Sequence, residues 1–437
     1  MLKFYNREKE TALLLKTEQL SIDNAQMTFV VGRRRIGKTS LLINVFAGKR
    51  TVYFFVEKKN EALLCEEFIE EIQNKLGVTV FGQMRTFKDV FGYLMNFSEN
   101  QHFTLIIDEF QEFRNINASI YSEMQNIWDK YKNNSKLNLI LCGSVYSLMK
   151  QIFENSKEPL FGRATARLHL KTFDIKTLKE ILADYYPKFT NEDLLAFYLF
   201  TGGVAKYVEL LTNTQAFTMK KIVNEILSES SLFLNEGKNV LIEEFGKDYG
   251  NYFSILMLIA SSKTSRAEME SVMNVGLGGF LEKLENEFGL ISKLRPILSK
   301  PAGKSVKYRI NDNFLNFWFR FIYKYRGAIE MENFDYVKNI IARDYTTYSG
   351  QILERYFREK LSVEENLSAI GSYWETGNQN EIDIVALNEY EKRAIIVEVK
   401  RQSEKINLNT LQNKSKNLID KLKGYDIEYR ALSIENM

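Results

Sequence analysis

The eight residues from Gly32 to Thr39 constrain the fold of this chain more than any other segment. They read Gly-Arg-Arg-Arg-Ile-Gly-Lys-Thr and stand between the apolar run Thr28 to Val31 and the helical run Leu41 to Ile43. Strand, glycine-rich turn and helix in this order predict a P-loop. Glycines let backbone N–H groups turn inward, and the helix N-terminus adds its dipole. The segment therefore predicts a binding site for the phosphates of a nucleoside triphosphate.

Each residue type in this loop has an expected task. Lys38 is expected to contact the β and γ phosphates, and the Thr39 hydroxyl is expected to bind a Mg²⁺ ion. The three arginines between the glycines are expected to face outward. The residues of this segment that are expected to bind the nucleotide are Gly32, Ile36, Gly37, Lys38, Thr39 and Ser40.

A second part of the site is predicted where the apolar run from Thr104 ends in two carboxylates, Asp108 and Glu109. Asp108 is expected to hold the hydrated Mg²⁺ ion, and Glu109 is placed to polarise the attacking water as a general base. The alternative, in which both residues only begin a solvated loop, is weakened by the P-loop. Two carboxylates therefore predict hydrolysis as well as binding.

Two further polar residues are candidates for the same site. Ser144 ends the apolar run from Leu139 and would lie near the γ-phosphate if that strand sits between the other two. Arg163, in a loop before a fifth strand, is a candidate arginine finger that neutralises charge in the transition state. The alternative for Arg163 is a surface or ion-paired arginine. If Arg163 acts on a neighbouring subunit, the chain works as a homo-oligomer.

Short β-branched runs alternate with helical stretches up to residue 170, which predicts a parallel sheet covered by helices. Strands are expected at Thr28 to Gly32, Thr51 to Val56, Thr104 to Phe110, Leu137 to Ser144 and Ala166 to Leu170. The amphipathic helices that follow Thr172 predict a helical lid. Because 437 residues exceed one ordinary core, four domains are expected, at residues 1–171, 172–245, 246–330 and 331–437.

Composition excludes several kinds of site and location. Two histidines and two cysteines make a zinc site or a His-based triad very hard to build, and the apolar contexts of Cys65 and Cys142 predict buried, reduced thiols. The N-terminus is charged where a signal peptide is apolar, and no uncharged run approaches the roughly 18 residues of a membrane span. A cytoplasmic protein without membrane contact is therefore expected.

These motifs resemble the archaeal-type branch of AAA+ ATPases, within the STAND-related P-loop proteins of prokaryotes. The segments that carry the resemblance, besides the P-loop, are Phe4 to Glu10, Ile107 to Gln111, Cys142 to Ser144, Leu160 to Arg163 and Thr201 to Val204. The resemblance implies that Phe4, Asn6, Arg7 and Glu8 border an adenine. It is this resemblance that makes ATP, with Mg²⁺, the expected nucleotide.

Two strands near the C-terminus carry charges that a core strand would not need. Glu398 and Lys400 are two residues apart and share one face, and Asp383 lies in the neighbouring run. Asp383 and Glu398, with Glu354 on the preceding helix, are candidate ligands for a second Mg²⁺ or Mn²⁺ site, and Lys400 would orient water or stabilise the phosphorane. The spacing resembles the PD-(D/E)xK nuclease fold, although no proline precedes Asp383. A solvated hairpin and an inactive nuclease fold are the alternatives.

A winged helix is expected between Tyr249 and Ile310, with a pair of strands around Lys300 to Lys304. Its candidate wing is basic and carries Lys293, Arg295, Lys300, Lys304, Lys307 and Arg309. The third helix instead offers three glutamates beside Lys283, which does not suit the major groove. The alternatives are contact with the DNA backbone at low sequence specificity, or a role in protein packing. The aromatic run from Phe314 to Tyr323 predicts core packing over base stacking.

Taken together, the chain is expected to have an α/β fold. The expected parts are an AAA+-like P-loop sheet, a helical lid, a winged helix and a small restriction-endonuclease-like domain. The leading hypothesis is a cytoplasmic ATPase whose nucleotide state positions the winged helix and a nuclease-like domain on DNA. The alternative is a non-nucleolytic switch in which ATP gates the binding of DNA or a protein partner.

Overall fold

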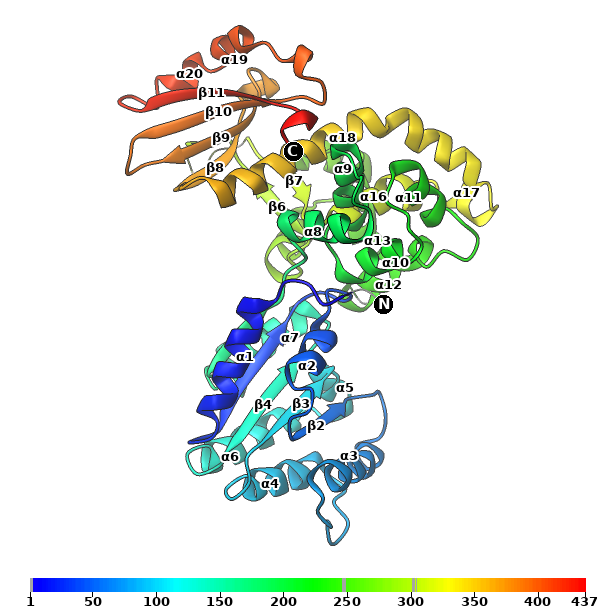
Figure 1. Cartoon of the computed structure of the whole chain (residues 1–437), viewed down its shortest axis with the longest axis vertical. Helices are drawn as coiled ribbons and strands as arrows, with labels where there is room; N and C mark the ends of the chain where they lie inside the picture. The colour runs from blue at the N-terminus through cyan, green and yellow to red at the C-terminus, as the bar shows by residue number, and fades with distance from the viewer. Residues whose placement is uncertain (1–2, 246–248, 301–302, 304) are drawn as a thin grey trace. The chain divides into compact units, whose positions relative to one another are not determined.

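The computed structural model describes residues 3–245, 249–300, 303 and 305–437 of the chain (Figure 1). These residues form two compact units. The first unit is Tyr5–Thr172, and the second is Phe173–Met437 together with the N-terminal residues up to Phe4.

The first unit is built on a five-stranded parallel sheet with the strand order β2-β3-β4-β1-β5. Its strands are β1 (Gln26–Val31), β2 (Thr51–Phe55), β3 (Phe103–Asp108), β4 (Leu137–Cys142) and β5 (Ala166–His169). Every residue of β1, β3 and β4 is buried, as expected for a parallel sheet that is covered on both faces. The predicted strands are confirmed, but β3 ends at Asp108 because Glu109 has a left-handed backbone, with φ 54°.

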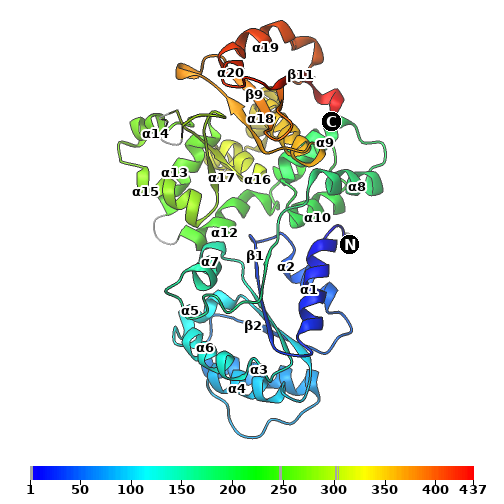
Figure 2. The same ribbon diagram turned by 90° about the vertical axis from the view of Figure 1, so that its left-hand side faces the viewer.

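Helices cover both faces of this sheet (Figure 2). The helical elements are α1 (Glu8–Leu20), α2 (Lys38–Val45), α3 (Glu61–Leu76), α4 (Phe87–Phe97), η1 (Phe110–Glu112), α5 (Phe113–Ile116), α6 (Ile120–Tyr131) and α7 (Tyr146–Glu154). Apolar residues of α3, α4, α6 and α7 share one core with the sheet, and α1 packs against β1 and α2. Asn60 and Thr86 cap α3 and α4 with their side chains. Cys65 and Cys142 are buried free thiols, as predicted.

The second unit begins with helices. They are α8 (Ile175–Tyr185), α9 (Asn191–Thr201), α10 (Ala205–Asn213), α11 (Met219–Ile226) and α12 (Phe233–Phe245). Thr190 and Asp193 form a capping box at the start of α9, and every residue from Leu194 to Thr201 is buried. A helix that is apolar on all sides has to be enclosed by others, and α8, α11 and two later helices, α16 (Asn313–Phe317) and α18 (Phe334–Glu364), pack around α9.

The next elements follow the order expected for a winged helix. They are α13 (Tyr249–Ala260), α14 (Arg266–Met273), α15 (Gly278–Glu282), the π-helical turn η3 (Lys283–Glu287), β6 (Ile291–Leu294) and β7 (Lys307–Ile310). β6 and β7 pair in antiparallel register, so a pair of strands is present. Its predicted position around Lys300 to Lys304 is wrong, because the strands lie before and after that segment. Lys304 lies outside the described residues. The winged helix remains a prediction that this order supports.

Aromatic side chains form the centre of the second unit. The elements that carry or surround them are α16 (Asn313–Phe317), the π-helical turn η4 (Trp318–Tyr323), α17 (Arg326–Glu330) and α18 (Phe334–Glu364). Phe314, Phe317 and Phe319 are fully buried, and Gly237 lies so close to Trp318 that a Cβ there would be 2.3 Å from the ring. Core packing of the aromatic run, as predicted, is confirmed.

The C-terminal residues form a four-stranded sheet in the order β11-β10-β9-β8. The elements are β8 (Ala369–Tyr373), β9 (Ile382–Asn388), β10 (Arg393–Val399), α19 (Leu408–Lys414), α20 (Lys416–Ile419) and β11 (Asp426–Leu432), with short turns η5 (Thr376–Asn378), η6 (Ser403–Lys405) and η7 (Ile434–Asn436). β8, β9 and β10 are antiparallel neighbours, and β11 is parallel to β10. The order along the chain is therefore α18-β8-β9-β10-α19-β11.

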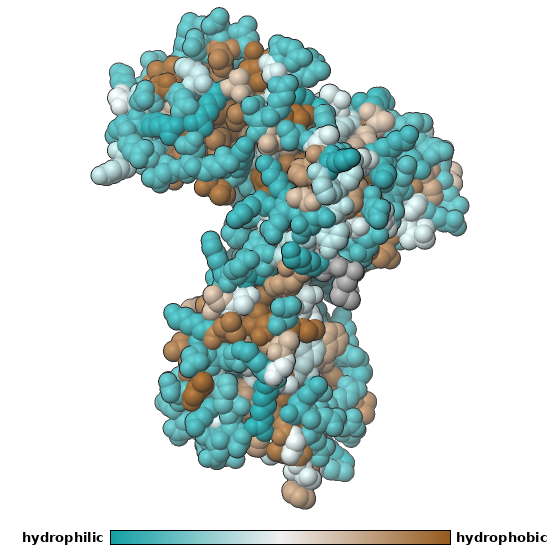
Figure 3. Space-filling model, viewed as in Figure 1, coloured by the Kyte–Doolittle hydropathy of each residue, from teal (hydrophilic) through white to brown (hydrophobic). Residues whose placement is uncertain are grey.

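The visible surface is mostly hydrophilic, with apolar residues in separate patches (Figure 3). No helix in the described ranges is both long and apolar enough to cross a membrane.

Candidate functional site

Two glycines shape the loop between β1 and α2. A Cβ on Gly32 would lie 2.3 Å from Ile36 Cδ1 and 2.8 Å from the carbonyl oxygen of Leu170, so a larger residue has no room there. Gly37 has a φ of 92° at the start of α2, a conformation that glycine adopts without strain. The loop therefore curls tightly around the first turn of α2, where backbone N–H groups are unpaired.

Lys38 lies across this loop and is buried. Its Nζ donates hydrogen bonds to the carbonyl oxygens of Gly32 at 2.7 Å and Arg33 at 3.0 Å. Burial lowers the pKa of the Lys38 ammonium, while the nearby charges of Glu109 and Asp108 act in the opposite direction. The ammonium is thus held by backbone oxygens and is left unpaired with the two carboxylates.

Asp108 ends β3 beside the first turn of α2. Its Oδ2 accepts hydrogen bonds from the Thr39 hydroxyl at 2.9 Å and the Tyr53 hydroxyl at 2.7 Å. Burial raises the pKa of Tyr53, so this hydroxyl remains a neutral donor. Hydroxyl and carboxylate oxygens are the ligands that Mg²⁺ prefers. Thr39 and Asp108 therefore fit the Mg²⁺ site that the sequence predicts.

Glu109 follows directly and is held by neutral groups as well. Its Oε2 accepts hydrogen bonds from Ser144 Oγ at 2.7 Å and from Gln111 Nε2 at 2.5 Å. Ser144 reaches Glu109 because β4 lies between β1 and β3 in the sheet. This strand order is the one under which Ser144 was expected to lie near the γ-phosphate. Tyr53 was not predicted as a site residue because the pairing of β2 with β3 sets its contact with Asp108. Gln111 ends a segment that carries the family resemblance, but no role was assigned to it.

The N-terminal Asn-Arg-Glu segment touches the same loop. Asn6 and Arg7 have left-handed backbones, with φ of 55° and 87°. Arg7 is buried, and its Nη2 donates to the carbonyl oxygen of Ile36 at 3.3 Å. This contact places the segment beside the P-loop, while the border with an adenine remains a prediction. Phe4 belongs to the other compact unit.

Arg163 and Ser40 are the other residues proposed for this site. Arg163 forms an ion pair with Asp129, whose Oδ2 lies 3.0 Å from Nη2 and 3.2 Å from Nε. The structure thus has the ion-paired arrangement that was the alternative for this residue, and the arginine-finger role remains a prediction. Ser40 is exposed on the first turn of α2.

A second group of charged residues lies in the C-terminal sheet. The β9–β10 ladder pairs Ile384 with Val397, so Asp383 and Glu398 come next on the two strands, opposite each other. Lys400 Nζ lies 2.9 Å from Glu398 Oε1 and 3.3 Å from Asp383 Oδ2. Lys414 of α19 also pairs with Glu398 Oε1 at 3.3 Å. Glu398 Oε2 is buried and has no hydrogen-bond partner within the described part of the chain.

Glu354 lies near this cluster but outside it. It is partly buried on α18, and burial, followed by the charge of Asp383, raises its pKa to about 8. Within the described ranges, no group of three or more His, Cys, Asp or Glu side chains could hold a metal ion. Asp383 is held instead by the backbone N–H of Val399 and by Lys400. Glu354 as a third metal ligand therefore remains a prediction.

The basic residues of the candidate wing do not form one open strip. Lys293 and Lys300 are exposed, but Lys307 pairs with Glu381 at 2.8 Å and lies over the ring of Trp374. Arg309 is partly buried, and its Nε has no hydrogen-bond partner. The contacts of Lys307 with Glu381 and Trp374, and the partial burial of Arg309, could not be predicted from the count of charges in the wing.

A parallel sheet of this order, with a P-loop after β1 and two carboxylates after β3, defines a P-loop ATPase fold. Residues 4–211 match the family described as an ATPase domain predominantly from Archaea, so this part of the chain is similar to archaeal-type ATPase domains. Residues 318–416 match archaeal and bacterial proteins of unknown function.

Individual proteins resemble the chain over most of its length. An uncharacterized protein of Methanocaldococcus jannaschii is 29% identical over 406 residues, which are 91% of this chain and 87% of that protein. The solved structure of a Walker-type ATPase of Pyrococcus abyssi covers 72% of this chain and 96% of its own, with a TM-score of 0.55 and 18% identity. The second likeness shows the fold alone.

Proposed function

We propose that the chain is a Mg²⁺-dependent ATPase whose nucleotide state controls DNA contact by the C-terminal unit. The observation that carries the hydrolytic part is the position of two carboxylates beside the P-loop. Asp108 meets the Thr39 hydroxyl, and Glu109 meets Ser144 at the end of the next strand. One carboxylate is thus available for the metal and the other for water.

The reaction follows from these positions. Lys38 stabilises the negative charge on the β and γ phosphates, and Thr39 with Asp108 would hold the Mg²⁺ ion. Bound Mg²⁺ neutralises charge that develops on the phosphate oxygens. Glu109 accepts a proton from water as the water oxygen bonds to the γ phosphorus and the bond to the β–γ bridging oxygen breaks. The products are ADP and inorganic phosphate.

Glu109→Gln tests the general base. The variant is expected to hydrolyse ATP about 10²- to 10⁴-fold more slowly, the usual contribution of a general base, and to bind ATP normally. Glu112→Gln is the matched control, because Glu112 lies three residues on and is held by Asn115. Phosphate release and binding of a fluorescent ATP analogue are measured in parallel. Unchanged hydrolysis by Glu109→Gln would remove this assignment.

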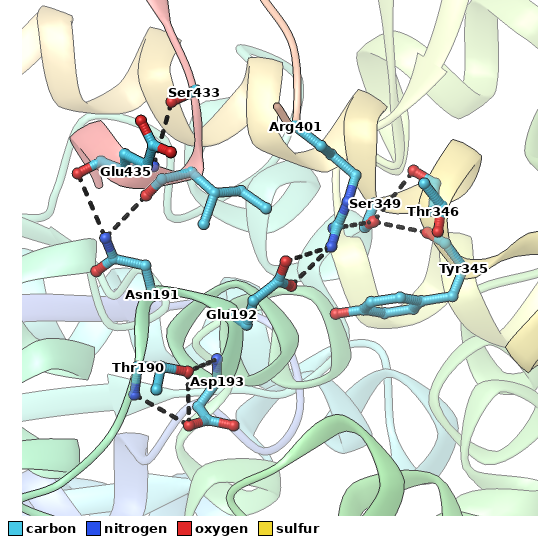
Figure 4. A network of polar contacts seen from close by, with 11 residues as sticks. Thr190, Asn191, Glu192, Asp193, Tyr345, Thr346, Ser349, Arg401, Ser433 and Glu435 are labelled. Atoms are coloured by element: carbon cyan, nitrogen blue, oxygen red, sulfur yellow. Dashed lines mark hydrogen bonds and ion pairs between the residues drawn. The ribbon is translucent and has the colours of Figure 1, made fainter. Parts of the chain in front are cut away.

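A network at the start of α9 supports control of the C-terminal unit by nucleotide (Figure 4). Both carboxylate oxygens of Glu192 accept hydrogen bonds from Arg401 Nη2, at 2.5 and 2.7 Å. Arg401 follows Lys400 directly, and its Nη1 donates to Ser349 Oγ. Glu192 lies within the residues that match the ATPase domain. The network lies within the second unit and joins α9 to the residue next to the charged cluster of the C-terminal sheet.

The control of DNA contact is tested by nucleotide-dependent affinity. DNA binding is expected to differ between protein loaded with a slowly hydrolysed ATP analogue and protein loaded with ADP. Glu192→Gln is expected to reduce that difference while leaving ATP turnover in place. Equal DNA affinity in both nucleotide states would contradict the proposed control.

A second candidate function is metal-dependent cleavage of DNA. The order α18-β8-β9-β10-α19-β11 and the mixed sheet favour the PD-(D/E)xK resemblance. The unpartnered, buried Glu398 Oε2 beside Asp383 fits a cation ligand. Asp383 and Glu398 would hold the ion, and Lys400 would hold a water or stabilise charge on the phosphate.

Purified protein tests this second candidate directly. It is expected to cleave DNA with Mg²⁺ or Mn²⁺, and Lys400→Ala is expected to abolish cleavage while ATP turnover continues. If wild-type protein cleaves no form of DNA or RNA, the nuclease function fails and the non-nucleolytic switch remains.

A further inference from the structure

A cleft of about 710 Å³ lies within the second unit. It is wide enough for a nucleotide-sized ligand. The charged residues that line it from β7, α18 and β9 are Lys307, Arg309, Glu354, Arg355, Arg358 and Asp383. The cleft therefore joins the candidate wing to one carboxylate of the C-terminal cluster.

Three of its four cations have partners that explain their presence. Lys307 pairs with Glu381 at 2.8 Å. Arg355 donates to the carbonyl oxygens of Ile310 at 2.7 Å and Asn311 at 3.1 Å, which ties α18 to the end of β7. Arg358 donates to Ser372 Oγ and to the carbonyl oxygen of Asp383. These side chains hold the walls of the cleft in place.

Arg309 differs from the other three. Among the described residues, no acidic side chain forms an ion pair with it and no hydrogen bond holds its guanidinium. Arg358 also has a buried Nε without a partner, but its Nη2 is held by Ser372 and Asp383. Burial, together with repulsion from Arg355 and Arg358, lowers its pKa to about 9. Glu354 is the nearby acidic residue that favours the charge, but it forms no ion pair with Arg309 among the described residues. A partly buried cation beside two like charges and without an ion pair adds little stability, so stability alone does not account for an arginine at this position.

We propose that Arg309 binds a phosphate group of a nucleic-acid strand in this cleft. The inference rests on the proposed DNA contact of the C-terminal unit and adds where the strand lies. A guanidinium offers several N–H donors in a plane that matches phosphate oxygens. Ser262 lines the same cleft, whereas the hydroxyls of Ser265 and Ser372 there already donate to Glu268 and to the carbonyl oxygen of Asp383. The bound phosphate would lie beside Asp383.

Arg309→Met and Lys293→Met form a matched pair for the test. Lys293 pairs with Tyr308 in the β6–β7 ladder and is exposed, so its side chain and that of Arg309 leave opposite faces of the same two-stranded sheet. If DNA strands bind along the exposed face of the wing, both variants lose DNA affinity equally. If the cleft holds the phosphate, only Arg309→Met does.

The measurement is fluorescence anisotropy of full-length protein with labelled single-stranded DNA of about 20 nucleotides, longer than a typical single-strand site. Arg309→Met is expected to bind about tenfold or more weakly, as expected for loss of a charge-assisted contact, and to lower the salt dependence by roughly one phosphate contact. Lys293→Met is expected to change affinity less than about twofold, as is usual for one exposed charge. Arg309→Lys is expected to lie between wild type and Arg309→Met.

Melting temperature separates binding from a structural role. Arg309→Met is expected to melt at the same temperature as wild type or higher, because a repelled buried charge is removed. A clearly lower melting temperature would assign Arg309 to the fold and overturn the inference, as would unchanged DNA affinity. The inference is also overturned if free inorganic phosphate or dAMP raises the melting temperature of wild type but not of Arg309→Met, while both proteins bind the DNA strand equally well.

The failure of the two proposals can be told apart. If wild-type protein binds no DNA, the proposed DNA contact itself fails. If wild type binds DNA and Arg309→Met binds it equally well, only the place of the phosphate is wrong.

Discussion

Two pairs of carboxylates stand at the ends of apolar strands, and they are held in opposite ways. Asp108 and Glu109 accept hydrogen bonds from hydroxyl and amide groups, and Lys38 beside them is bound to backbone carbonyls. Asp383 and Glu398 are instead joined by the ammonium group of Lys400, with Lys414 also on Glu398.

These contacts determine how easily each pair of carboxylates can bind a metal ion. Neutral donors can turn away from a carboxylate without leaving a charge unpaired, so a dication can approach Asp108 at little electrostatic cost. A dication that approaches Asp383 and Glu398 meets an ammonium group that already neutralises them. The ATP site should therefore be the stronger metal site of the two.

The largest expected effect comes from the lysine of the first pair. Lys38→Ala should lower ATP turnover by at least about 10²- to 10³-fold, because a preorganised cation at the phosphates is lost. Lys49→Ala, on a lysine that pairs with Glu18 at the surface of the same unit, should leave turnover unchanged. Near-normal turnover by Lys38→Ala would contradict this prediction, because it would show that the P-loop lysine does not contribute to ATP hydrolysis.

The next effect concerns Glu354 and pH. Its pKa is raised to about 8 in the folded chain, so the stability that its protonated form contributes is fully present below pH 4.5 and is lost as the pH rises through about 8. Glu354→Gln should therefore be more stable than wild type at high pH by roughly 1–3 kcal/mol, the usual cost of a buried polar group without a partner. The difference should shrink toward low pH.

Thermal melting of wild type, Glu354→Gln and Glu364→Gln across this pH range provides the measurement. Glu364 is exposed on the same helix, so its variant should follow wild type. A gap between Glu354→Gln and wild type that stays constant with pH would show that Glu354 does not titrate in this range.

Tyr53→Phe tests whether neutral donors are easily replaced. Loss of the hydrogen bond to Asp108 should lower turnover by about two- to tenfold, the range of one neutral hydrogen bond. Steady-state ATP hydrolysis over a Mg²⁺ titration measures the effect. Tyr121→Phe is the control, because the Tyr121 hydroxyl donates to backbone carbonyls of Phe110 and Gln111. A loss as large as that of Lys38→Ala would show that the donors are not interchangeable.

The smallest effect is expected at Lys414. Its removal should strengthen Mn²⁺ binding to the C-terminal pair by about two- to fivefold, the range of a partly exposed ion pair. Mn²⁺ titration followed by electron paramagnetic resonance, in an Asp108→Asn background, isolates this site. Lys416→Ala, an exposed neighbour, should bind as the background does. Weaker Mn²⁺ binding after Lys414→Ala would contradict competition between the lysine and the metal.

Sequence patterns predicted the parts of the fold whose causes are local. The strand, loop and helix around Lys38 are adjacent in the chain, and the apolar runs of β1 to β5 are continuous because both faces of the sheet are buried. The β9–β10 alternation likewise placed Glu398 and Lys400 on one face. These features follow from short-range spacing, which a single sequence displays.

Contacts between distant segments could not be predicted in this way. Arg163 meets Asp129, 34 residues away, and Tyr53 meets Asp108 across a strand pair. Arg309 was counted with the open wing, yet packing against α18 buries part of it. In each case tertiary packing selects the partner, and neither residue type nor spacing marks it.

Helix α9 also determines which fragments of the protein can fold separately. The match to the ATPase domain runs to residue 211, whereas the compact units divide between Thr172 and Phe173. A fragment that ends at 211 would keep α9 but lose α11, α16 and α18, and the buried run Leu194 to Thr201 would face water. Such a fragment should aggregate. Fragments divided after Thr172 keep each apolar core whole and are the ones to express.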